Sequence, residues 1–483
     1  MTALAGRPPG WGATLQAALG QWRSVAFWLA LSTLAVFLGL LCVLLPWVLV
    51  LGLAAAVCYA ALLWSSPPAA VGVYFLALLL SPDFKLSDVL TACTLACLGV
   101  ALLLDRQRLK FPRRAWHVYA FFMGMVLLSA LLALAYFGNS LAYVYRDGRA
   151  FMYWVWLPIL FWMCNRSADA PARLSRLLIG MAVAVSVLAL VQYFFGLQLV
   201  REGRVGALET GGVVDADLTR VQMPGFTFVL VALVWAMSKL MRGGRALWWV
   251  LPSVLLFAAA IYVNFGRALW FWTFVAVALS GLLMGLRRSL SLAGLLCAVG
   301  LVVGTSLFVF KPAVIDNMVH RMVSVIDEGG SGSSFGWRKL ENDAALIQIE
   351  RSPLVGMGLG AEYRRWMAEV RNFTEHTRYV HNSYVFMALK LGVPALLALM
   401  VLIMRPWWIM FRGRAQASVR QNDMLVALLA SWLPLLAIST TQPELVNPHT
   451  IFLYCIMLAL FLTAIHGRDA QARLLKQAAS TQP

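Results

Sequence analysis

The stretch from Ser331 to Gly392 decides how the whole chain is interpreted. It contains SGSSFGWRKLENDAALIQIERSPLVGMGLG at 331–360 and HTRYVHNSYVFMALKLG at 376–392. The segments before and after it are mostly apolar, whereas this stretch is polar and rich in charge. It runs into an apolar segment through His381, Asn382 and Ser383. We therefore expect any chemistry of this protein at that junction.

The composition places the rest of the chain in a membrane. Of 483 residues, 61% are hydrophobic and only 12% are charged, whereas soluble domains carry about 25% charged residues. Apolar runs of roughly 20 residues recur, and each is long enough to cross a bilayer as a helix. They lack the alternation of transmembrane β-strands. The sequence predicts an all-α polytopic membrane protein with about 12 (12–14) transmembrane helices.

The positions of the positive charges set the predicted orientation. The formal net charge is +18, but most Lys and Arg lie in short loops between apolar runs, which indicates topology and not a nucleic-acid partner. These loops and both termini are predicted to be cytoplasmic. The large polar loop then lies outside, in the periplasm of a bacterium. The predicted organisation is N-terminal transmembrane helices over 1–310, a helical outer loop over 311–383, and C-terminal helices with a tail over 384–483, starting with a span over 384–404.

The outer loop is predicted to be helical. Ser333 or Ser334 can cap a helix that Ser352-Pro353 ends at about Arg351. An apolar stripe on this helix consists of Leu340, Ala344 and Ile347. This stripe would lie on the membrane surface or on the bundle. Another face of the helix carries Arg338, Glu341, Ala345 and Gln348. A second short helix is expected over Ala361–Arg371. Between the two helices, Gly356, Gly358 and Gly360 indicate a turn or a close backbone approach.

His381 is the candidate general base. Asn382 and Ser383 are natural N-cap residues for the apolar segment that follows, so His381 would lie at the outer membrane surface beside the positive end of a helix. That field disfavours imidazolium, and a neutral imidazole is what a general base requires. A plain interfacial histidine is the alternative interpretation of the same position.

Arginines on the outer side are candidate ligands for an anion. Arg267 is the only charge among the 41 residues of 246–286, and the short turn at 264–267 would hold it at the outer surface. Arg146 and Arg149 lie at the outer start of another span, and Arg338 lies in the large loop. Arginine forks suit phosphate oxygens. For Arg267, a corner arginine bound to lipid phosphate is the simpler alternative.

Neither a metal nor a disulfide is expected. Asp215-Ala216-Asp217 could hold a divalent cation beside a phosphate, but so short a pattern arises easily by chance, and a solvated loop is favoured. The seven cysteines all lie in apolar runs. The histidines of the large loop lack partners at the spacing of a metal site.

Three stretches together resemble the O-antigen ligase and O-antigen polymerase superfamily. They are Phe265-Gly266-Arg267, the segment from Trp337-Arg338 to Gly358-Leu359-Gly360, and His381-Asn382-Ser383-Tyr384. The resemblance covers roughly 250–395; elsewhere only the hydropathy is similar. Each motif is loose, but their order and their common predicted side are fairly specific.

The resemblance implies a metal-independent, inverting glycosyltransferase with a GT-C-like fold and a periplasmic site in the bacterial inner membrane. The donor would be a glycan on undecaprenyl pyrophosphate, and the acceptor of a ligase would be lipid A–core; no cofactor is implied. His381 matches the family's essential histidine and would deprotonate the acceptor hydroxyl. Arg267 and Arg338 match its essential arginines and would bind the pyrophosphate. Arg146 and Arg149 are added as pyrophosphate ligands from their position alone.

Other functions are open at this point. Within the superfamily, the chain could be an O-antigen polymerase or a protein O-oligosaccharyltransferase. The moderate size of the outer loop at 196–223 favours a ligase, because polymerases often carry a second large outer loop. A transporter of lipid-linked glycans is the alternative from another class. Transporters tend to show internal repeats and charges at mid-membrane, whereas the unexpected charges here gather at the outer surface.

Overall fold

The chain folds into a bundle of helices. The computed structural model describes residues 47–80, 85–104, 112–167, 169–200, 203–210, 213–243, 247–285, 334–365, 377–412 and 421–480, with a few single positions between 287 and 305. The helices of these residues are α2 Trp47–Ser65, α3 Pro67–Leu80, α4 Lys85–Leu104, α5 Arg113–Ala135, α6 Leu141–Met152, η2 Tyr153–Val155, α7 Trp156–Arg166, α8 Ala170–Phe195, α9 Phe226–Arg242, α10 Leu247–Val263, α11 Arg267–Met284, α14 Ser334–Arg351, α15 Ser383–Leu391, α16 Val393–Phe411, α18 Asp423–Ile438, η3 Glu444–Val446 and α19 Pro448–Ser480.

Several of these helices are suited to cross a membrane. Five are long and apolar enough to do so: Arg114–Ala135, Ala170–Phe195, Arg267–Met284, Val393–Phe411 and Pro448–Ile465. Shorter apolar helices, such as α3 and α18, accompany them. The architecture is that of a polytopic membrane protein, as the composition predicts. Much of the expected boundary near residue 310 lies outside the described residues, so the division into three regions stays a prediction.

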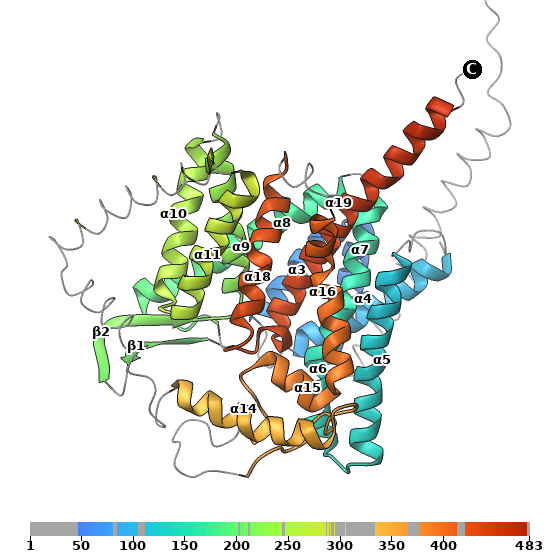
Figure 1. The fold of residues 1–483 in the computed structure, drawn as a ribbon, viewed down its shortest axis with the longest axis vertical. Helices are drawn as coiled ribbons and strands as arrows, with labels where there is room; N and C mark the ends of the chain where they lie inside the picture. Colours follow the sequence, from blue (N-terminus) through green and yellow to red (C-terminus); the bar gives the residue numbers. More distant parts are fainter. Residues whose placement is uncertain are drawn as a thin grey trace, which may run out of the picture.

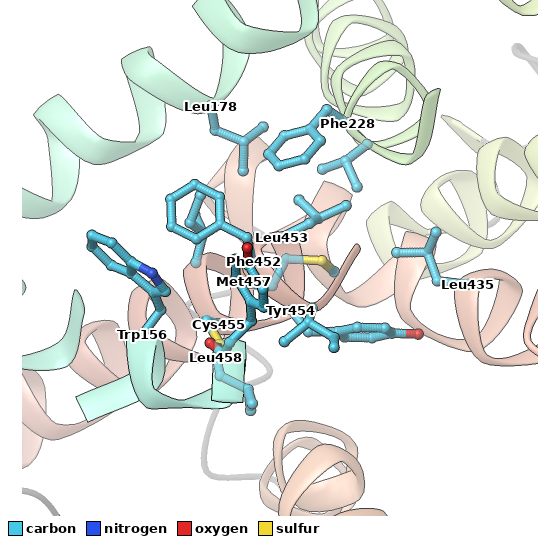
Figure 2. Close-up of a cluster of buried hydrophobic side chains, with 14 of the residues drawn as sticks. Trp156, Leu178, Phe228, Leu435, Phe452, Leu453, Tyr454, Cys455, Met457 and Leu458 are labelled. Carbon is cyan, nitrogen blue, oxygen red and sulfur yellow. The ribbon is translucent and has the colours of Figure 1, made fainter. Parts of the chain in front are cut away.

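The last helix, α19, forms the centre of the bundle. In its segment Pro448–Ile465, 89% of the residues are buried inside the protein, compared with 28–39% in the other four long apolar helices. Figure 2 shows Phe452, Leu453 and Tyr454 of this helix among side chains from α7, α8, α9 and α18. A helix that is apolar on all sides is buried in this way when its neighbours surround it.

The polar elements gather at one end of the bundle. In Figure 1, α14, α15 and a two-stranded hairpin lie at the lower end, while the C-terminal part of α19 projects from the upper end. This arrangement puts the quoted polar stretch and the last helical residues at opposite ends, as the loop charges predict.

The prediction that residues 384–404 form a single transmembrane helix is wrong. α15 ends at Leu391, and Gly392 has φ +87° before α16 begins. Glycine adopts this left-handed conformation without the steric cost of a Cβ, and Pro394 is well placed in the first turn of the next helix. α15 is therefore a short helix at the polar end, and α16 alone is long enough to cross a membrane.

The loop at 196–223 contains a β-hairpin that the sequence analysis did not predict. β1 Arg204–Thr210 pairs antiparallel with β2 Val213–Gln222, with Thr210 opposite Val213. The pair Gly211-Gly212, followed by the alternating run at 214–219, is a known signal for a hairpin. The all-α prediction holds for the bundle, and β1 and β2 are the strands found in the described part of the chain.

Helix α14 is confirmed with the predicted bounds, but its packed face is the polar one. Glu341 and Ala345 are 1% and 0% exposed, whereas Leu340 and Ile347 are 45% and 52% exposed. Leu340 and Ile347 therefore face away from the bundle, consistent with the membrane-surface alternative, whereas Ala344 packs against the core. The second expected helix is not found at 361–365, which is non-helical, and residues 366–371 lie outside the described part.

Candidate functional site

His381 is held by a buried carboxylate. Its Nδ1 lies 2.8 Å from Oε2 of Glu341, and its backbone N–H donates to the same oxygen over 3.2 Å. An ionised carboxylate only accepts hydrogen bonds, so this contact assigns the proton of the neutral ring to Nδ1. Nε2 is then the ring atom that can accept a proton. The predicted base therefore has the partner that orients a histidine for general-base chemistry.

The backbone around His381 is fixed by the start of α15. The side chain of Asn382 accepts hydrogen bonds from the N–H groups of Tyr384 and Val385 over 3.0 and 3.3 Å, which confirms the predicted N-cap. Ser383 has another role: its hydroxyl donates to the carbonyl of Gln442 and accepts from the N–H of Leu445. These bonds tie the histidine to the turn between α18 and α19.

Tyr379 packs edge-on against His381, with the ring centroids 5.1 Å apart. Burial raises the pKa of the Tyr379 hydroxyl well above its ordinary value, with further influence from two carboxylates and two guanidinium groups; these belong to Glu341, Glu444, Arg338 and Arg146. Two of the predicted arginines, Arg338 of α14 and Arg146 of α6, are thus close enough to influence the hydroxyl of the tyrosine that packs on His381.

Glu341 is a candidate functional residue that the sequence placed on the same face of the helix as Arg338, without indicating a role for it. It lies three residues after Arg338, so both project from neighbouring positions on α14. Its Oε1 is buried and has no hydrogen-bond partner within the described residues. Burying a carboxylate in this way is costly, which marks it as a functional candidate. The signal available in the sequence was its i+3 spacing from Arg338.

Glu444 is a second carboxyl group that the sequence analysis passed over. It lies in η3, in the turn that Ser383 contacts. Burial raises the pKa of the Glu444 carboxyl, and the hydrogen bond from the Thr450 hydroxyl opposes that rise. Together with Glu341 it gives the surroundings of Tyr379 two carboxyl groups and two guanidinium groups.

Arg267 is positioned by a tightly built corner at the same end of the bundle. Phe265 adopts φ +50° and packs with Tyr262 and Trp270. A Cβ at Gly266 would lie 2.3 Å from the side-chain oxygen of Asn264, so a larger residue there would displace the Asn264 side chain. The corner is tied to β2, because Arg220 Nε donates to Asn264 O over 3.1 Å. Arg267 follows as the first residue of α11.

Arg267 and His381 are connected through α18. Helix α11 packs against α18, and Ser439 at the end of α18 accepts a hydrogen bond from the backbone of Ser383 over 3.0 Å. The corner and the histidine therefore share one end of the bundle. The role of Arg267 as a ligand of pyrophosphate stays a prediction.

Arg146 and Arg149 both lie on α6 but have different neighbours. Arg146 acts on Tyr379, as described above. Arg149 forms an ion pair with Asp88 of α4 at 3.7 Å and lies 6.0 Å from the ring centroid of Tyr145. The role of Arg149 toward an anion also stays a prediction, and this ion pair links the first turn of α4 to the last turn of α6.

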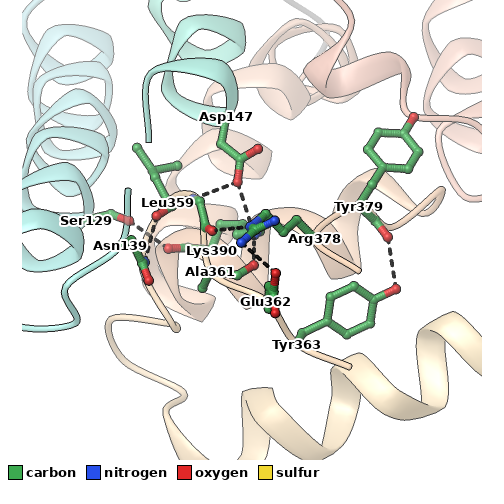
Figure 3. A network of polar contacts seen from close by, with 11 residues as sticks. Ser129, Asn139, Asp147, Leu359, Ala361, Glu362, Tyr363, Arg378, Tyr379 and Lys390 are labelled. Carbon is green, nitrogen blue, oxygen red and sulfur yellow. Dashed lines mark hydrogen bonds and ion pairs between the residues drawn. The ribbon is translucent and has the colours of Figure 1, made fainter. Parts of the chain in front are cut away.

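A buried ion pair joins the elements that surround the site. Lys390 is 0% exposed, and its Nζ lies 3.0 Å from Asp147 Oδ2 and 2.5 Å from the carbonyl of Ala361. Asp147 also accepts a hydrogen bond from the N–H of Gly360 over 2.8 Å. Figure 3 shows these contacts joining α6, α15 and the loop after α14. The sequence analysis gave Lys390 no role, although a lysine within an apolar stretch calls for a partner.

The three glycines after α14 confirm the predicted close approach. Gly356, Gly358 and Gly360 all have positive φ. A Cβ at Gly356 would lie 2.5 Å from the Leu389 carbonyl, and one at Gly360 would lie 2.8 Å from the backbone N of Val144. The loop can therefore lie directly on the backbone of α15 and α6 because these positions lack side chains.

Asp215 and Asp217 lie on strand β2, not in the irregular loop that the sequence analysis favoured. The alternation of apolar and polar residues over 214–219 is typical of a strand. Within the described ranges, no three His, Cys, Asp or Glu side chains form a group suited to a metal ion. Metal-independent activity of the chain stays a prediction.

Comparison with known proteins identifies one domain. Residues 252–400 match the family model described as O-antigen ligase. No curated protein matches the chain. The matched range contains the corner with Arg267, helix α14 with Arg338 and Glu341, the glycine loop and His381. Residues 252–400 of this membrane protein therefore constitute a domain of the O-antigen ligase family.

Proposed function

We propose that the protein is a glycosyltransferase that moves O-antigen glycan from undecaprenyl pyrophosphate to lipid A–core. The observation that carries the proposal is the contact between Glu341 and Nδ1 of His381, with Arg338 one turn away on α14. It supplies a base and a cation at the polar end of an apolar bundle. The family of residues 252–400 supports lipid-linked glycan as the substrate class.

The proposed reaction is an inverting displacement. Nε2 of His381 takes the proton of the acceptor hydroxyl, and that oxygen forms a bond to the anomeric carbon of the donor. The bond between this carbon and the pyrophosphate oxygen breaks, and its electron pair leaves with the pyrophosphate. Arg267 and Arg338 stabilise the charge that builds there, with Arg146 and Arg149 as further ligands. No metal or cofactor takes part.

In this proposal the protein lies in the bacterial inner membrane with its site on the periplasmic side. It has a GT-C-like arrangement of about 12 spans, with cytoplasmic termini. Residues 1–310 and 384–483 are its membrane regions, and 311–383 form the outer loop. The support is the gathering of α14, α15 and the hairpin at the end opposite the last residues of α19 (Figure 1).

An assay with the purified full-length chain tests the function. We expect lipid A–core to receive glycan when donor and acceptor are both present, and no product with donor alone. Elongation of the donor by itself would instead indicate a polymerase, and transfer to a protein acceptor would indicate an oligosaccharyltransferase. Activity is expected to persist in EDTA; its loss would contradict the metal-free mechanism and return attention to Asp215 and Asp217.

A further inference from the structure

A cavity lined by both polar and apolar residues lies at the same end of the bundle as the proposed catalytic residues (Figure 1). It has a volume of about 550 Å³ and lies between the loop joining α5 to α6, the last turn of α14 and the loop that follows it. Cavities that bind small ligands are commonly about 300–1,000 Å³ in size. Among the residues that line it are Phe137, Ser140, Gln348, Arg351, Glu362 and Arg378.

The cavity is close to His381. Arg378 precedes His381 by three residues, and three residues span at most about 10 Å. Gln348 follows Glu341 by seven residues on α14, which is two helical turns, so both residues lie on the same face about 10 Å apart along the axis. The nearest part of the cavity wall is therefore separated from His381 by about the length of one or two sugar residues.

The charge of Arg378, one of the two arginines that line the cavity, is compensated within the protein. Arg378 forms an ion pair with Glu362 at 2.6 Å, donates from Nε to the carbonyl of Gly360 over 3.0 Å, and lies 3.6 Å from the ring centroid of Tyr143. Figure 3 shows the pair of Arg378 and Glu362 beside Ala361. The lining suits a hydroxyl-rich ligand, because its carboxylate accepts hydrogen bonds from sugar hydroxyls while its amide and hydroxyl groups both donate and accept.

The position along α14 separates this cavity from the arginine that faces the donor. Arg338 precedes Gln348 by ten residues, or about 15 Å of helix, and Glu341 with its histidine lies between them. In an inverting displacement the attacking oxygen and the leaving group lie on opposite sides of the anomeric carbon. A cavity beyond the base, on the side away from Arg338, therefore has the position that acceptor sugars require.

The wall of the cavity is built in advance. Nδ2 of Asn139 donates to the Leu359 carbonyl over 2.9 Å, and Lys390 and Asp147 hold Ala361 and Gly360 from the bundle side. Binding then requires little ordering of the protein. We propose that this cavity binds the sugar residues of the acceptor oligosaccharide; the proposal rests on the function proposed above.

Acceptor kinetics with the full-length chain test the proposal. Gln348→Trp fills the cavity, and Gln348→Ala removes only its amide. At saturating donor, we expect Gln348→Trp to raise the KM for lipid A–core by about tenfold or more, with the donor KM within about twofold of wild type. Gln348→Ala should raise the acceptor KM by a smaller factor. Glu350→Gln, an exposed change on the same helix outside the cavity, is the control and should alter neither value.

Binding of delipidated core oligosaccharide provides a second readout that does not depend on turnover. We expect the His381→Ala variant to bind it and the double variant with Gln348→Trp to lose that binding. An unchanged acceptor KM in Gln348→Trp would overturn the cavity proposal while leaving the function intact. A wild-type chain that transfers nothing to lipid A–core would overturn both.

Discussion

At the scale of single residues, the contact between Glu341 and His381 is the feature with the clearest chemical consequence. A carboxylate on Nδ1 fixes the tautomer and the ring orientation, and it stabilises the imidazolium that forms when Nε2 takes a proton. Glu341 touches no reacting atom in the proposed mechanism, so it is a positioning residue.

Glu341→Gln is expected to lower kcat about 10- to 100-fold with little change in the KM of either substrate. The amide keeps the shape of the side chain but loses its charge. A double-mutant cycle separates this role from a structural one: once His381 is alanine, Glu341→Gln should cost nothing further in rate. Equal additional losses in both backgrounds would contradict the positioning role.

Arg338→Ala is expected to lower kcat about 10²- to 10³-fold, since it removes a cation that balances the charge of the leaving pyrophosphate. Arg338→Lys should restore part of the rate, because a lysine keeps the charge but not the two-pronged geometry of a guanidinium group. Steady-state kinetics with a defined lipid-linked donor would measure both variants. If alanine and wild type turned over equally, Arg338 would have no role in the displacement.

At the scale of elements, the glycine loop after α14 joins the site to the bundle. Its positive φ values and its contact with the backbones of α6 and α15 leave no space for side chains. Gly360→Ala is expected to destabilise the protein by about 2 kcal/mol or more through strain and displacement of the loop. Thermal unfolding in detergent would detect the change.

Gly124→Ala is the matched control for that substitution. Gly124 lies within α5, and a Cβ there would meet nothing within 4 Å. Alanine at this position should leave the unfolding temperature unchanged or raise it slightly. Equal stability of the two variants would show that the loop does not depend on glycine at Gly360.

The bounds of α14 and the cap at Asn382 could be predicted because each depends on a few neighbouring residues. The break at Gly392 was visible as Gly-Val-Pro but was overridden by the apolar run around it. The hairpin was missed because its Gly-Gly turn was considered only as part of a loop. The contacts of His381 with Glu341 and of Lys390 with Asp147 join residues far apart in sequence, so only the tertiary fold could reveal them.

At the scale of the whole molecule, the two ends of the bundle differ in character. The polar elements and the candidate site occupy one end, and the last part of α19 projects from the other (Figure 1). The proposed transfer between two membrane-bound substrates takes place on one side of the membrane, and the gathering of the polar elements at one end (Figure 1) suits it. The hydropathy and the positions of the basic residues could predict this arrangement, whereas the central place of α19 could not, because an apolar run does not reveal whether lipid or protein surrounds it.

Labelling of single cysteines tests the orientation. The seven native cysteines would be replaced by serine, and Glu350→Cys on α14 or Arg412→Cys after α16 would be introduced at exposed positions. A membrane-impermeant maleimide added to spheroplasts should modify the first and reach the second only after permeabilisation. The opposite pattern would place the candidate site in the cytoplasm and contradict the proposed topology.

The most direct measurement of the central claim is the rate of glycan transfer from undecaprenyl pyrophosphate to lipid A–core by purified wild type and His381→Ala. The mechanism predicts a loss of about 10³-fold, the scale of an essential general base. His117→Ala, an exposed histidine at the start of α5, should retain the wild-type rate. Transfer by His381→Ala at the wild-type rate would contradict the account.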